Sequence, residues 1–288
     1  MHTRRNLGVT TALLVVVLIS LPSPSEAFVQ TMTCSPDGVF RCRAGETPLP
    51  VQWPFLKLSY YIHEQGAADL PPGPDGLISD ELEAAIIQSF DSWNAPNCSE
   101  LELVYQGLSK RTEIGYQDTQ NPEGNINLVL WQDEAWPYGS YAAVALTTVT
   151  FRPSTGFIVD ADIELNGDLY RFTNSDNPAN TIVDVRNTLT HEVGHFIGLD
   201  HSSIPAATMF STAPPGELSK RILHSDDIAG LCHIYPVGFI ENRPPTAPED
   251  DGWCSVAPRH TTPTLPAGAA LCLLGLAAWI RTRRRSTI

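Results

Sequence analysis

The sequence predicts an α+β domain in which helices cover a mixed five-stranded sheet. The first observation is the order of its periodic segments: a strand, a helix, four strands, a helix, a loop and a final helix. The second is that these segments run through residues 51–236, a length that suits one domain with one hydrophobic core. No internal repeat interrupts them.

The elements follow from the spacing of apolar and β-forming residues. Alternation in residues 56–63 predicts the first strand. Apolar residues at helical spacing predict a helix that begins at the capping pair Asp80 and Glu83 and ends before Pro96. The same criteria predict four more strands and two more helices, at residues 101–105, 125–131, 142–151 and 157–165 and at residues 181–199 and 226–235.

The N-terminal residues predict export. Two arginines precede an apolar run, and Ser25-Glu26-Ala27 has the small residues that signal peptidase requires. Residues 1–27 are therefore predicted to be a signal peptide that is cleaved after Ala27. Residues 28–50 form a Cys-containing segment before the domain, and the Pro-rich residues 237–264 form a linker after it.

The C-terminal residues 265–288 join an apolar stretch to a cluster of arginines, and Cys254 lies just before them. A cysteine, an apolar helix and terminal arginines resemble bacterial C-terminal sorting tails. A plain membrane anchor is the alternative. Both interpretations place the body outside the cytoplasm, secreted or on the cell surface. Both also bring the tail into contact with the membrane, at least transiently.

The charge and the cysteines agree with an exported protein. The formal net charge is −14 at pH 7, and several of the basic residues lie in the two ends, so the body repels nucleic acid and anionic lipid. Four cysteines of the body could form two disulfides in three possible pairings. The favoured pairing is Cys34–Cys42, which are close in sequence, and Cys98–Cys232, which would tie the early part of the domain to its last helix.

Residues 190–202, THEVGHFIGLDHS, predict a metal site. His191 and His195 are four residues apart, so on a helix they lie on one face. Gly198 can take the positive φ that ends a helix, and the chain can then present His201 from outside it. Three imidazoles that face one point form an open zinc site with room for water.

Glu192 lies between the first two histidines, off the ligand face but beside the metal. There it can act as the general base that takes a proton from zinc-activated water, which is the equipment for hydrolysing an amide. The alternative is a helix with ordinary core or surface histidines. That alternative requires five residues to fall at fixed offsets by accident.

The segment HEVGHFIGLDH fits HExxHxxGxxH, the signature of the metzincin zinc endopeptidases. Ser202, Met209 at a Met-turn distance, and the Asp226-Asp227 pair of a final helix resemble the matrixin branch of that class. The resemblance implies that the sheet is mostly parallel and that the zinc site lies at the active-site helix. It also implies that Gly198, Met209, Ser202 and the aspartate pair support the site, and that an extended protein or peptide substrate adds to the strand edge around residues 144–147.

The sequence also departs from vertebrate matrixins. The strands that carry histidines for a second, structural zinc in that branch contain none here, so one zinc ion is expected. The acidic residues Asp160, Asp162 and Glu164 could bind calcium, or they could form a solvated strand face. Cys42 lies in a segment similar to the inhibitory propeptide motif, where a thiolate could cap the zinc instead of forming a disulfide.

The sequence therefore predicts an exported zinc endopeptidase that cleaves internal peptide bonds. The alternative is a non-catalytic surface adhesion or binding module on the same scaffold. Glu192 separates the two hypotheses, because a scaffold without activity tends to lose the base, and here it is present.

Overall fold

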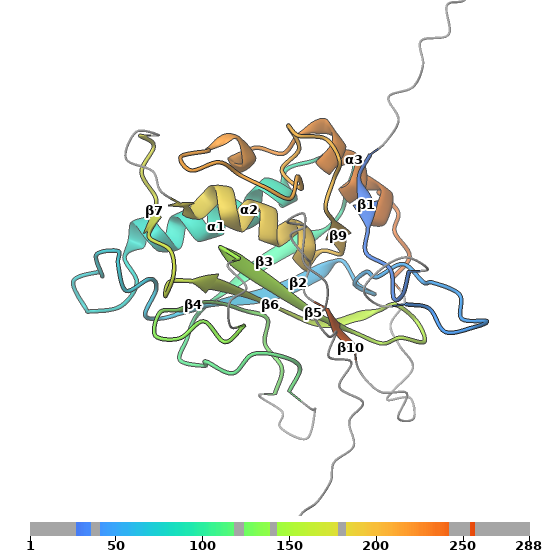
Figure 1. The fold of residues 1–288 in the computed structure, drawn as a ribbon, viewed down its shortest axis with the longest axis horizontal. Helices are drawn as coiled ribbons and strands as arrows, with labels where there is room; N and C mark the ends of the chain where they lie inside the picture. The colour runs from blue at the N-terminus through green and yellow to red at the C-terminus, as the bar shows by residue number, and fades with distance from the viewer. Residues whose placement is uncertain are drawn as a thin grey trace, which may run out of the picture.

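The computed structural model describes residues 27–35, 41–117, 124–138, 143–177 and 183–241, and the backbone of residues 254–256. Its centre is a sheet with the strand order β10-β5-β6-β4-β2-β3 (Figure 1). The five long strands are β2 (Lys57–His63), β3 (Glu102–Ser109), β4 (Leu128–Gln132), β5 (Ala145–Phe151) and β6 (Ile158–Asn166). A short strand, β10 (Cys254–Val256), is added at the edge.

The strand directions make the sheet mixed. β2 runs parallel to β3 and to β4, and β4 runs parallel to β6. β5 runs antiparallel to β6, and β10 runs antiparallel to β5. The predicted mixed, mostly parallel five-stranded sheet is therefore confirmed, and the structure adds β10 as a sixth, short strand.

Two helices, α1 (Asp80–Asn94) and α2 (Val185–Phe196), lie side by side on one face of the sheet (Figure 1). Phe90 of α1 stacks on Tyr60 of β2 with ring centroids 3.6 Å apart. Trp93 of α1 donates its indole N–H to the carbonyl of Thr190 in α2 over 2.9 Å. This buried hydrogen bond fixes the position of α2, the helix that carries the histidine motif.

The starts of both helices differ from the prediction: α1 has a different N-cap, and α2 begins later. The predicted pair of Asp80 and Glu83 at the start of α1 is wrong, because Ser79 is the N-cap and its hydroxyl accepts from the Leu82 N–H. Asp80 is instead the first helical residue, where a carboxylate favours the positive end of the helix dipole. The helix α2 begins at Val185 because Asp184 caps it and accepts from the Asn187 N–H over 2.7 Å.

The N-terminal segment packs against the end of α2. β1 (Val29–Gln30) pairs antiparallel with β9 (Leu199–Asp200). Thr31 donates its N–H to the carbonyl of Gly198 over 2.9 Å and accepts from the N–H of Val51 over 2.8 Å. The described part of residues 28–50 therefore shares the core of the domain.

The remaining elements precede and follow α2 in the chain, and β8 and η2 contact it. β7 (Phe172–Thr173) and β8 (Val183–Asp184) form a two-stranded parallel pair before α2. The 3₁₀ helix η2 (Ser219–Arg221) and the helix α3 (Ser225–Ile234) follow the histidine motif. The structure contains the disulfides Cys34–Cys42 and Cys98–Cys232, with Cα atoms 4.9 Å and 5.5 Å apart.

Within these ranges, no helix combines the length and the apolar character that crossing a membrane requires. Of the predicted signal peptide, residues 1–27, only Ala27 is described, and residues 1–26 lie outside the described residues, as does the apolar tail of residues 265–288.

Candidate metal centre

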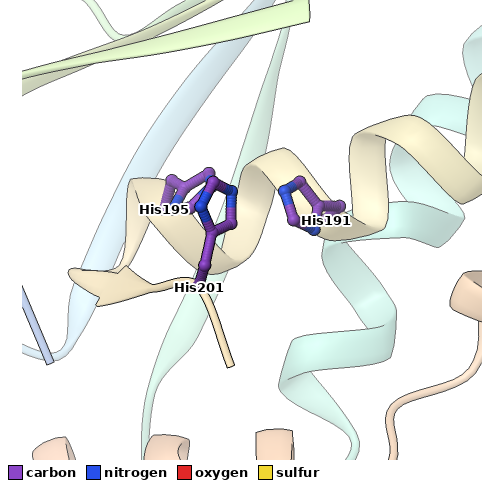
Figure 2. Close-up of side chains that lie close together, drawn as sticks. All are labelled: His191, His195 and His201. Carbon is purple, nitrogen blue, oxygen red and sulfur yellow. The ribbon is translucent and has the colours of Figure 1, made fainter. Parts of the chain in front are cut away.

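The three histidines of the motif converge on one point. His191 and His195 project from α2 and His201 from the segment after β9, with their rings turned toward one another (Figure 2). One ring nitrogen from each lies within 4.8 Å of the others. His195 Nε2 and His201 Nε2 are 3.3 Å apart. Among the described residues this is the one group of three or more side chains with the spacing of metal ligands.

Backbone carbonyls orient two of these rings. His191 Nδ1 lies 2.6 Å from the carbonyl oxygen of Thr208, and His195 Nδ1 lies 2.8 Å from that of Leu199. A hydrogen bond from Nδ1–H to a carbonyl leaves the Nε2 lone pair as the ligand and holds the ring in place. Three neutral imidazoles arranged in this way are the donor set that zinc prefers, so the residues present fit the ion.

Gly198 makes the turn that brings His201 to the site. Its φ is +96°, in the left-handed region that glycine adopts without strain. A Cβ at this position would also lie only 2.5 Å from the carbonyl oxygen of Val51. The role of Gly198 therefore has two physical causes, its positive φ and the close approach of the N-terminal segment.

Glu192 is buried beside the histidines and contacts β5. Its side chain is 3% exposed, and Thr147 of β5 is fully buried. The Thr147 hydroxyl lies 2.6 Å from Glu192 Oε2 and 3.1 Å from the Glu192 carbonyl oxygen. The Glu192 carboxylate is thus held by a hydrogen bond from the sheet rather than only by its own helix.

Met209 packs beneath the motif. A Cβ on Gly194 of α2 would lie 2.1 Å from Met209 Sδ, so the glycine between His191 and His195 leaves the space that the methionine fills. Asp227, at the start of α3, accepts from the N–H groups of Thr208 and Met209 over 2.8 Å and 2.9 Å. The carbonyl of the same Thr208 orients His191, so α3 supports the site through this turn.

Asp226 supports the segment that follows His201. One of its carboxylate oxygens accepts from the Ser202 hydroxyl over 2.6 Å. The other accepts from the N–H groups of Ala27 and Phe28 over 2.9 Å and 3.0 Å. This aspartate therefore connects the residue after His201 to the N-terminal segment. The supporting residues named from the sequence, Ser202, Met209, Asp226 and Asp227, lie in one contact network with the histidines.

Burial dominates the electrostatics of the site. Burial lowers the pKa of His191 well below its ordinary value, and the neighbouring charges of His195, Lys220 and His201 lower it further. Lys220 is itself buried, which lowers its pKa, and its ammonium donates to the carbonyl of Phe210. A neutral His191 is the form that binds a metal ion.

The acidic strand residues lie on the face of β6 that points away from the helices, and they are buried. Asp160, Asp162 and Glu164 are each at most 1% exposed, so the expectation of a solvated strand face is wrong. Glu164 is bonded to Gln132 and Tyr138, and Asp162 accepts from the N–H groups of Gly115 and Leu128. Loops cover this face of the sheet, and a strand pattern does not reveal such loops.

Two further residues of the site escape prediction from sequence. Thr147 lies in a strand predicted as a substrate edge, but its contact with Glu192 joins segments 45 residues apart. Lys220 is an isolated lysine after the motif, and only the folded chain shows that it is buried near Glu192.

The architecture and the three-histidine centre are those of a metzincin. The family model of the matrixins matches residues 73–236, more than half of the sequence, and the chain belongs to the matrixin family.

Curated relatives carry protease names. Metalloendoproteinase 5-MMP of Arabidopsis thaliana is 38% identical over 166 residues, which cover 56% of this chain and 41% of that protein. Metalloendoproteinase 1-MMP of the same plant is 42% identical over 170 residues, covering 56% and 40%. Neutrophil collagenase of Homo sapiens is 25% identical over 239 residues, covering 82% and 43%. The matches thus span less than half the length of these relatives.

Proposed function

We propose that this chain is an exported zinc-dependent endopeptidase that hydrolyses internal bonds of proteins or peptides. The observation that carries the proposal is the placement of Glu192 between two convergent histidines, with its carboxylate held by Thr147. A helix that kept the histidines only for packing would not need a buried carboxylate beside them, because burying an acid is costly. The metalloendoproteinase names of the relatives agree with this proposal.

The residues divide the chemistry as follows. His191, His195 and His201 would hold one zinc ion, which lowers the pKa of a water molecule and polarises a carbonyl oxygen. Glu192 would accept the proton of the attacking water and deliver it to the leaving amide nitrogen. The Thr147 hydroxyl keeps the carboxylate in one orientation before the substrate arrives, which reduces the entropy lost on reaching the transition state.

An extended substrate would lie along β5. This strand carries Thr147, and it is one of the two outermost long strands of the sheet, at the edge opposite β3. A polypeptide that pairs with its outer edge passes the residue that contacts Glu192. The proposed reaction therefore acts on peptide bonds within an extended substrate. The substrate side chains that the protein prefers depend on the protein residues around the site.

Substitution of the base and of a ligand tests the proposal. Glu192→Gln keeps the size of the side chain but cannot accept a proton, so peptide hydrolysis should fall by about 10²–10⁴-fold while the zinc content stays at one ion per chain. His195→Ala should lose both zinc and activity. The measurements are metal content and peptide cleavage on the same preparations.

Three outcomes would contradict the assignment. Near-normal turnover by Glu192→Gln would remove the role of the base. A wild-type protein that binds zinc and cleaves no peptide or protein would instead be a binding module. Two tightly held zinc ions per chain would contradict the single-ion site.

Export and calcium belong to the same proposal. The signal-like N-terminus, the cysteine pairs and the sorting-like residues around Cys254 support a secreted or surface location. The buried row of Asp160, Asp162 and Glu164 supports the proposal that the fold also binds a calcium ion.

A further inference from the structure

The outer edge of β5 carries a segment from far along the chain. β10 pairs antiparallel with β5, with Cys254 opposite Phe151, Ser255 opposite Thr150 and Val256 opposite Val149. The segment thus pairs with β5 from more than a hundred residues further along the sequence (Figure 1). It lies within the Pro-rich stretch that the sequence predicts as a linker, so part of that stretch is a strand of the sheet.

The direction of β10 points along β5 toward the metal centre. Successive residues of β10 pair with successively earlier residues of β5, from Phe151 to Val149. Thr147, which contacts Glu192, lies two residues before Val149 on the same strand. An extended chain that keeps this antiparallel register therefore runs from the Phe151 end of β5 toward the carboxylate of Glu192.

This edge is also where main-chain groups are available to another strand. The other side of β5 is paired along its length with β6, so added strands can pair only on the side that β10 uses. A strand with such an edge accepts a peptide through main-chain hydrogen bonds, which depend little on its side chains. A substrate that continues past Thr147 to Phe151 needs the same hydrogen-bonding groups as β10.

We propose that the segment Cys254–Val256 is an intramolecular occupant of the β5 edge, which competes with extended substrates for residues Val149–Phe151. The proposal rests on the proposed endopeptidase function for its consequence, but the occupancy itself does not. A tethered segment competes at an effective concentration on the order of mM, so even a weak three-residue pairing affects substrates. The competition concerns substrates that reach Phe151, whereas shorter substrates avoid it.

The test changes β10 in the full chain. Ser255→Pro combined with Val256→Pro removes two N–H donors and restricts the backbone, so β10 should no longer pair. The matched control, Ser255→Ala combined with Val256→Ala, removes the same side chains and keeps both donors. Hydrogen exchange of the β5 amides should accelerate in the proline variant relative to the alanine variant. Equal exchange in the two variants would overturn the proposal.

Substrate length gives the functional arm of the test. Two peptides share one cleaved sequence, and the longer begins about six residues before the cleaved bond while the shorter begins about two residues before it. The proline variant should cleave the longer peptide with a kcat/KM roughly three- to tenfold above the alanine control, and the shorter one at the same rate. An equal gain for both peptides, or none for either while the wild type is active, would overturn the competition.

The exchange measurement separates this proposal from the proposed function. If no variant cleaves any peptide, the endopeptidase assignment fails. The pairing of β10 with β5 is then tested by the hydrogen exchange of the β5 amides. Competition is tested by the binding of the longer peptide, measured by fluorescence anisotropy. Tighter binding by the proline variant supports competition, and equal binding by both variants overturns it.

Discussion

At the scale of single residues, the Thr147 hydroxyl sets the position of the Glu192 carboxylate. Thr147→Val keeps the shape of the side chain and removes the hydrogen bond. A hydrogen bond to a charged group is worth about 1.5–3 kcal/mol, so kcat/KM should fall by about 10- to 100-fold. Zinc content should not change, because the Thr147 hydroxyl bonds to Glu192, which is not one of the three proposed zinc ligands.

Thr147→Ser is the matched control, because it keeps the hydroxyl. It should retain most of the wild-type kcat/KM. A Thr147→Val variant that cleaves peptides like the wild type would show that β5 does not position the base. A variant that loses zinc would show that the effect is one of folding.

Asp160 is a second residue with a testable effect, here on the pH dependence of stability. Burial raises its pKa to about 6, above the ordinary value of 3.8. The folded chain therefore keeps this proton in a pH range where the unfolded chain has lost it, and the free energy of unfolding falls as the pH rises through that range. Asp160→Asn should raise Tm above about pH 6 and leave it nearly unchanged below about pH 4.

Thermal unfolding at several pH values measures this effect, with the exposed Asp91→Asn as the control that should show no such difference. A Tm of Asp160→Asn below that of the wild type at pH 8 would contradict the prediction. If calcium neutralises the acidic row, the ion should raise the Tm of the wild type at pH 8 and leave that of Asp160→Asn unchanged.

At the scale of elements, the start of α3 supports the metal centre from a distance. Asp227 holds the N–H groups of Thr208 and Met209, and the Thr208 carbonyl orients His191. Asp227→Asn replaces one accepting oxygen by a donor that faces an N–H group. Because partners behind the ligands typically contribute 10–100-fold to metal affinity, zinc affinity should fall by about 10-fold or more.

Competition with a zinc chelator measures the affinity. The control is Ser225→Ala, at an exposed position in the first turn of α3. The hydrogen bonds to the N–H groups of Thr208 and Met209 come from Asp227 and not from Ser225. An unchanged affinity in Asp227→Asn would mean that the His191 ring keeps its orientation without the support of α3.

The elements also show which parts of the structure local sequence signals can predict. The histidine spacing, the glycine turn and the aspartate pair each depend on neighbours a few residues away, and the structure brings all of them to one site. Errors arise where two close alternatives compete, as for Ser79 and Asp80 at the start of α1. They also arise where the environment is set by distant segments, as for the loops over Asp160 and the pairing of β10.

At the scale of the whole molecule, the metal centre is surrounded by segments from both ends of the domain. Phe28 bonds to Asp226 of α3, and Thr31 bonds to Gly198 at the end of the histidine helix. Loss of the contacts between the N-terminal segment and α3 would therefore disturb the turn that presents His201. The stability of the fold and the geometry of the site are linked through these long-range contacts.

The two disulfides should contribute unequally to this stability. Cys98–Cys232 joins residues 134 apart in sequence, whereas Cys34–Cys42 joins residues 8 apart. In the chain-entropy model, the longer loop stabilises the folded state by about 5 kcal/mol and the shorter loop by about 2–3 kcal/mol. Replacing Cys98 and Cys232 by serine should therefore lower the urea midpoint more than replacing Cys34 and Cys42. Equal losses, or a larger loss for the short loop, would show that native contacts near the N-terminal segment outweigh the loop entropy of the unfolded chain.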